Sequence, residues 1–284
     1  MVVNNVVKFF RKEILFCDIH PICYEISTQK EIFKRHIQNM QSKDRFADSY
    51  QAQALPNLIS SSQSGLIKRG KGIDPVLQEN KAVNIRLAGE KINGIIIKPG
   101  QVFSFWKLVG KISEKNGYKD GRVIIGDKIE AGMGGGLCNL ANTLHLLILH
   151  SPMDVIEFHS HSDALAPDGE KRIPFATGTS IGYNYADYRF KNNTDQAVQI
   201  LIWCDEDYLY GELRSQVPFP WTYRLVEEDH HFKKEGDKYY RISKIYRETL
   251  DKDSQKVLGR LLVLDNHSEV MFDYSQIPVE QIRE

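Results

Sequence analysis

The 284-residue sequence lacks several features that would point directly to a function. It has no excess of charge of either sign, because 37 basic side chains are balanced by 37 acidic ones. A nucleic-acid-binding surface needs a basic excess on some domain, so we expect no nucleic-acid partner. No run of about eighteen apolar residues is present, and we therefore expect no transmembrane segment. The chain also shows no internal repeat.

Cysteine is scarce, and the N-terminal stretch lacks the pattern of an export signal. The four cysteines are Cys17, Cys23, Cys138 and Cys204. No basic region precedes an uninterrupted apolar core, and no small-residue cleavage site follows. The sequence therefore predicts a cytoplasmic protein whose thiols stay reduced.

Residues 131–150 are the most informative stretch that is present. Gly134, Gly135 and Gly136 run into Leu137 and Cys138, after which apolar residues recur at helical spacing. Cys138 is thus predicted at the first turn of a buried helix, where free N–H groups and the helix dipole favour an anion. Such a position suits a nucleophilic cysteine with a lowered pKa. The alternative is a buried structural cysteine after a tight connection.

Histidines and a carboxylate that could work with Cys138 follow later in the chain. His159 and His161 alternate in a β-like run over 155–162, so they are predicted to face the same side of a strand. Asp187 and Arg189 share one face of another predicted strand, and Asp187 could orient a histidine. Cys138, His159 and His161 also make a three-ligand set for zinc, although we expect no cofactor. The spacing of Cys17, His20 and Cys23 does not match a zinc site.

The hydrophobic pattern predicts an α+β fold. The helix carrying Cys138 is expected to pack on a mainly antiparallel sheet, with a helical N-terminal segment and a β-rich C-terminal extension. Thr28 and Glu31 indicate a capping box, and Asp74 is a predicted N-cap. Three parts are predicted: an N-terminal helical segment and linker (1–73), a central domain (74–215) and the extension (216–284). The expected elements are a helix from Ile32 to Met40, a polar connection over 58–72, a helix over 75–92, strands over 95–97 and 102–106, hairpins over 123–129 and 196–214, and three β-runs over 221–272.

Several pieces of residues 74–214 resemble the VanW family in both order and spacing. They are QENKAVNIRLAGEKINGIIIKPGQVFSFW (78–106), GYKDG (117–121), GGGLCN with its helix (134–150), E-x-H-x-H (157–161) and D-x-R-x-K-N-N-T-D (187–195). The resemblance implies a bacterial protein associated with glycopeptide (vancomycin) resistance or cell-envelope processes. It does not imply a particular reaction.

Three functional hypotheses remain open from the sequence. In the first, Cys138 attacks a carbonyl in acyl transfer or amide cleavage, with His161 or His159 as base and Asp187 orienting it. In the second, the chain is a non-catalytic module that binds a cell-wall precursor or glycopeptide. In the third, it is a Cys-His-His zinc protein. The expected ligand is a small molecule or cell-wall peptide, and the oligomeric state is left open. The predicted substrate-binding residues are Gly134, Gly135, Gly136, Asn139, Ser104, Arg189 and Tyr185.

Overall fold

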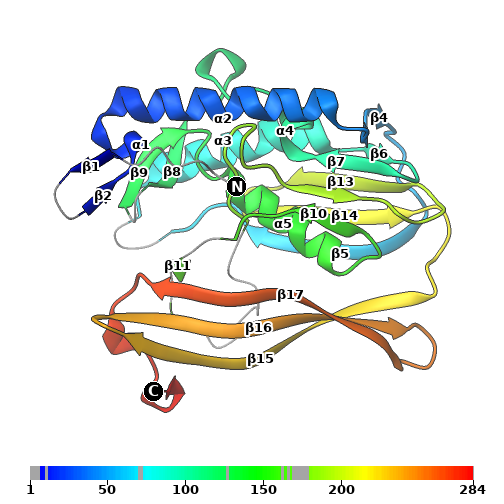
Figure 1. Ribbon diagram of the computed structural model, residues 1–284. Coiled ribbons are helices and arrows are strands. Elements are labelled where there is room, and N and C mark those ends of the chain that lie inside the picture. Colours follow the sequence, from blue (N-terminus) through cyan, green and yellow to red (C-terminus); the bar gives the residue numbers. More distant parts are fainter. Residues whose placement is uncertain are drawn as a thin grey trace.

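The computed structural model describes residues 7–9, 12–69, 73–125, 128–160, 163–164, 167 and 179–283. A long helix lies along the top of the molecule, a mixed body of helices and sheets lies beneath it, and a three-stranded β-meander lies at the bottom (Figure 1). The predicted α+β class is confirmed. In the described part of the chain, no helix is both long and apolar enough to cross a membrane.

The central sheet has five strands in the order β4-β6-β13-β14-β5, and every neighbouring pair is antiparallel. The predicted hairpin is confirmed as β13 and β14. Much of the polar stretch predicted as a connection is instead strand β5, which pairs with β14 and whose Ser60 and Ser64 hydroxyls bond to a neighbouring helix. The Ser60 hydroxyl, for example, donates to the Leu147 carbonyl at 2.9 Å. The strands are β4 (Ser49–Tyr50), β5 (Asn57–Gly65), β6 (Ile95–Ile97), β13 (Val198–Cys204) and β14 (Tyr208–Ser215).

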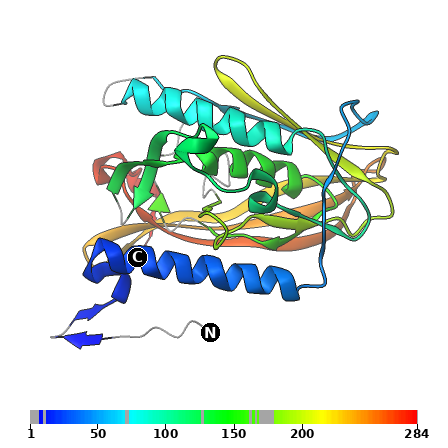
Figure 2. The ribbon, with the colours of Figure 1, turned by 90° about the horizontal axis from the view of Figure 1, so that it is seen from above.

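Two buried helices pack on this sheet, α3 (Pro75–Ile92) and α5 (Leu137–Leu149). Both were predicted, and Asp74 caps α3 by accepting from the Val76 and Leu77 amides. Seen from above, α5 lies between α3 and the long helix α2 (Figure 2). Apolar side chains of both helices join the sheet in one core; they include Ile85, Ala88, Ile92, Leu140, Leu144 and Leu147.

A smaller sheet, in the order β10-β12-β7-β3, carries much of the family signature. Two predicted strands end earlier than expected. The strand predicted to reach Trp106 stops at Ser104, whose hydroxyl caps the short helix α4 (Phe105–Val109). The run predicted over 155–162 is a strand only as far as Glu157. The strands are β3 (Arg45–Phe46), β7 (Gln101–Ser104), β10 (Asp154–Glu157) and β12 (Arg189–Lys191).

The N-terminal segment contains one long helix, α2 (Pro21–Gln41). It starts well before the predicted capping box, so Thr28 and Glu31 lie inside the helix. Its actual cap is His20, whose ring accepts from the Ile22 amide, with Pro21 at the first helical position. The nearby short elements are β1 (Val7–Phe9), β2 (Lys12–Ile14) and α1 (Phe16–Ile19).

The hairpin predicted over 123–129 is formed by β8 (Asp120–Ile125) and β9 (Lys128–Met133). The 3₁₀ turn η1 (Glu114–Asn116) precedes it.

The predicted β-rich extension is confirmed as a separate meander rather than a continuation of the central sheet. Its sheet order is β11-β17-β16-β15-β18. A second, small core forms there around Phe232, Val270 and Ile277. The elements are β11 (Asp163–Ala164), β15 (Trp221–Glu235), β16 (Lys238–Asp251), β17 (Val257–Val270), η2 (Tyr274–Gln276), η3 (Val279–Gln281) and β18 (Ile282–Arg283).

Candidate functional site

The glycine run forms a tight connection into helix α5. Gly134 and Gly136 have φ angles of 73° and 97°, in the left-handed region that favours glycine. Gly135 packs directly against the backbone of Gly121, where a Cβ would overlap it. Helix α5 begins at Leu137, so the predicted position of Cys138 in the first turn is confirmed.

The lowered pKa expected for Cys138 is not found. Burial raises the pKa of the thiol, although the Ile181 backbone amide hydrogen-bonds the sulfur and acts in the opposite direction. Desolvation disfavours the charged form of any acid, and here it outweighs the backbone hydrogen bonds to the sulfur. Cys138 is therefore a protonated thiol at neutral pH.

Residues 179–181 lie between helix α5 and the segment that contains His159. The Ile181 amide reaches Cys138, and the Thr179 amide donates to the Asn142 side chain one turn further along α5. The Ser180 amide, between them in the chain, donates to the His159 carbonyl at 2.7 Å. Thr179 also forms an isolated antiparallel bridge with Ser160, so this short segment links α5 to the segment after β10. His161 lies outside the described residues.

Asp187, predicted to orient a histidine, is fully buried among other donors. Its carboxylate accepts from the Ser104 hydroxyl at 2.5 Å and from Arg189 Nε at 2.7 Å. The backbone amides of Trp106 and Tyr188 donate to it at 3.1 and 2.9 Å. Asp187 therefore joins β7, α4 and β12. Among its described contacts no histidine ring takes part.

Glu157 is the centre of a second, adjoining group of charges. Arg35 donates to both of its carboxylate oxygens, at 2.7 and 2.5 Å, and His159 Nε2 lies 3.0 Å away. The Asp187 amide also donates to it, and Arg189 Nε lies at 3.5 Å. Burial alone would raise the pKa of Glu157, but these hydrogen bonds hold it below its ordinary value. The two carboxylates and two guanidiniums form one neutral network.

Through this network helix α2 is held to the body mainly by polar contacts, and α2 has no buried residue. Besides Arg35, the Asn39 side chain accepts from Arg189 at 2.8 Å, and Asn184 lies 3.2 Å from the His36 ring. Sequence reasoning missed these three α2 residues. Arg35 is 122 positions away from Glu157, and nothing in the local pattern of α2 indicates which side chain faces the signature.

A cavity of about 250 Å³ lies beside this network, between α2 and the body. The Trp106 and Tyr183 rings meet edge to face with centroids 5.6 Å apart. The Lys107 ammonium lies 4.3 Å from the centre of the Phe46 ring, which holds the charge near the cavity. The lining consists of His36, Asn39, Met40, Trp106, Lys107, Tyr183 and Asn184. It contains a cation but no carboxylate.

The remaining predicted residues have varied surroundings. Asn139 ties α5 to β5, because its side chain accepts from the Ser64 hydroxyl and donates to the Gly65 carbonyl. The Tyr185 carbonyl accepts from Arg35 at 3.1 Å, which places it beside the charged network. No group of three potential metal ligands occurs among the described residues, a set that excludes His161.

Comparison with known proteins agrees with the signature that these residues form. Residues 80–214 match the family model described as VanW like protein. Residues 80–214 are therefore a VanW-like region. The chain is 26% identical over 227 residues to the vancomycin B-type resistance protein VanW of Enterococcus faecalis, which covers 80% of this chain and 82% of that protein. It is 25% identical over 122 residues to the uncharacterized protein YoaR of Bacillus subtilis, covering 43% of this chain and 39% of that protein. No solved structure matches the chain significantly.

Proposed function

We propose that this protein is a non-catalytic binding module for a peptide of the cell envelope that ends in a free carboxylate. The observation that carries the proposal is the cavity under α2, which is lined by Lys107 and by no carboxylate. The neighbouring ion network contributes no net charge, since Glu157 and Asp187 are matched by Arg35 and Arg189. Lys107 is therefore the uncompensated charge of the cavity, and it favours an anionic ligand.

The other lining residues suit the rest of a short peptide. The side-chain amides of Asn39 and Asn184 can donate to and accept from peptide groups, and the Trp106 and Tyr183 rings offer apolar contact. The resemblance to a vancomycin resistance protein supports a ligand from the cell envelope.

Cysteine-dependent acyl transfer is less well supported by the same geometry. It needs a thiolate at neutral pH and an imidazole within hydrogen-bond reach of the sulfur. The pKa of Cys138 is raised, and the His159 ring is bonded to Glu157. In the proposed module Cys138 stabilises the fold, so Cys138→Ser should leave ligand binding unchanged.

Calorimetric titration of the full chain tests the proposal, with N-acetyl-D-alanyl-D-alanine and its C-terminal amide as the probes. We expect the free acid to bind at least about tenfold more tightly than the amide, because the amide cannot form a charge-assisted bond. Lys107→Met should weaken binding of the acid by a similar factor. Lys115→Met, which removes an exposed lysine from η1, is the matched control and should have no effect. Equal binding of acid and amide, or no binding of either, would overturn the proposal.

A further inference from the structure

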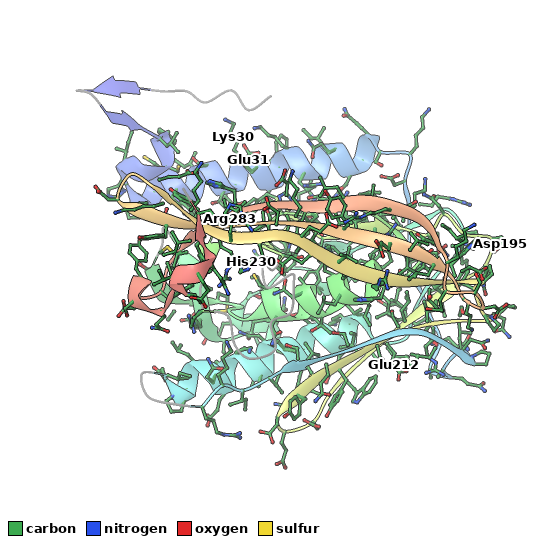
Figure 3. All side chains as sticks on the ribbon, turned by 90° about the horizontal axis from the view of Figure 1, so that it is seen from below. Lys30, Glu31, Asp195, Glu212, His230 and Arg283 are labelled. Carbon is green, nitrogen blue, oxygen red and sulfur yellow. The ribbon has the colours of Figure 1, made fainter. Side chains whose placement is uncertain are left out.

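A second and larger cavity, of about 790 Å³, lies where the chain passes from the central sheet to the meander. One side is formed by the start of β10 and by the signature turn after β12, including Asp154, Asn193 and Asp195. The other is formed by the linking segment and the first part of the meander. Figure 3 labels Asp195 at one end of the meander, opposite the end that carries Arg283. The volume of this cavity falls within the range of about 300–1,000 Å³ that is typical of ligand pockets.

Aromatic side chains line the meander side of this cavity. The Phe219 and Trp221 rings are stacked, with centroids 6.5 Å apart and an angle of 17° between their planes. Phe219 is buried beneath, whereas Trp221 stays 42% exposed at the cavity. Tyr223 lies alongside, with the Arg247 guanidinium 5.3 Å from its ring centre. A supported, exposed indole face of this kind can receive a flat apolar surface.

Polar groups on the opposite side are held in fixed positions. The Asn193 amide donates to the Asp154 carboxylate at 2.7 Å, which orients both side chains. From the meander side, Arg247 on β16 reaches across and donates to the carbonyl of Met153 at 3.1 Å. Carboxylates accept two hydrogen bonds side by side, and an amide both donates and accepts. This is the set of partners that neighbouring hydroxyl groups require.

We infer that this junction cavity binds a neutral pyranose saccharide. The C–H face of a pyranose ring is apolar and stacks on an exposed indole, while its hydroxyls bond to carboxylates and amides at the ring edge. The charges on the lining exclude a phosphate or acidic ligand, because Asp154 and Asp195 outnumber the one guanidinium of Arg247. The inference is independent of the proposed function, since it uses different residues and a different ligand.

The chain provides its own matched control for a tryptophan experiment. Trp203 is 45% exposed and stacked on Tyr210 with centroids 5.4 Å apart, so it resembles Trp221 in exposure and support. It lies on β13 and does not line the cavity. The third tryptophan, Trp106, is buried. A saccharide in the junction cavity should therefore change the fluorescence of Trp221 alone.

The test titrates the full chain with triacetylchitotriose, cellotriose and maltotriose, followed by tryptophan fluorescence and calorimetry. At least one saccharide should bind to the wild type and to Trp203→Ala, and Trp221→Ala should bind it at least about tenfold more weakly. Asp154→Asn should weaken binding without removing the aromatic platform. Lys107→Met should leave it unchanged, whichever way the peptide titration turns out. A far-ultraviolet spectrum and urea midpoint like those of the wild type show that each variant is folded. Absence of binding for all three saccharides, or equal binding by Trp221→Ala, would overturn the inference.

Discussion

Two regions of the signature bury an ionisable side chain, and the pKa of that side chain changes in opposite directions in the two regions. The Cys138 thiol receives a backbone hydrogen bond from Ile181 and faces no opposite charge in its described contacts, and burial raises its pKa. The carboxylate of Glu157 is also buried, but Arg35 and His159 bond to it, so its pKa is lowered. Burial thus favours the neutral form of the group without a charged partner, whereas partners keep the other group ionised.

Among the variants considered, we expect replacement of Glu157 to lower the stability of the fold most. Glu157→Gln removes the anion that faces Arg35 and Arg189, whose side chains are only 14% and 8% exposed. Arg189 keeps Asp187 as a partner, but the largely buried Arg35 loses its carboxylate, so we expect the free energy of unfolding to fall by about 3–5 kcal/mol. Urea denaturation measures this change.

The matched control is another glutamate paired with a base, on α2. Glu31 pairs with Lys34 at 2.6 Å, but both side chains are nearly half exposed. Glu31→Gln should therefore change the free energy of unfolding by no more than about 0.5 kcal/mol. If both glutamine variants lose the same stability, the buried network is not what holds α2.

His145 provides a second test of how burial acts on a group without a charged partner. It is a base with no carboxylate among its described contacts. It stacks on Phe158 at 4.5 Å and bonds to the Tyr188 hydroxyl, and burial lowers its pKa from 6.5 to about 4. As the pH falls from 6.5 toward 4, the unfolded chain takes up this proton and the folded chain does not. Stability from this group is complete above pH 6.5, and about 3 kcal/mol is lost by pH 4.

Urea denaturation at several pH values between about 7 and 4 tests this behaviour. His145→Phe should remove the acid-dependent loss attributed to His145, so its stability should fall less with pH than that of the wild type. His267→Asn replaces an exposed histidine paired with Glu235 and serves as the control. Parallel pH profiles for the wild type and His145→Phe would contradict the assigned shift.

What the sequence could predict was local. The cap at Asp74 and the apolar spacing after Gly136 set α3 and α5, because helix starts and stripes depend on neighbouring residues. The contact of Arg35 with Glu157 depends on how α2 packs, and helical spacing alone does not reveal it. Strand β5 was missed for a related reason, since its serines bond to α5 instead of showing an apolar alternation.

The pKa of Cys138 and the partners of Asp187 could not be predicted from neighbouring residues in the sequence either. A cysteine at a helix start is compatible with either a reactive or an inert thiol, and the covering residues decide which. Here burial raises the pKa of Cys138, and its backbone hydrogen-bond partner, Ile181, lies more than forty residues away in the sequence. Asp187 was singled out from the sequence, but its hydrogen bonds to Ser104 and Arg189 depend on how β7 and β12 pair, which its local pattern does not show.

The pKa of Cys138 tests the central claim most directly, namely that the signature builds a binding site around a protected thiol. It can be measured from the pH dependence of iodoacetamide modification, with each cysteine followed separately by mass spectrometry. We expect a midpoint for Cys138 above the ordinary thiol value of 9.0, and slow modification at neutral pH. A midpoint below that value, with Cys138 reacting faster than Cys17, Cys23 and Cys204 at neutral pH, would contradict this claim. It would instead support the hypothesis that Cys138 is a nucleophile.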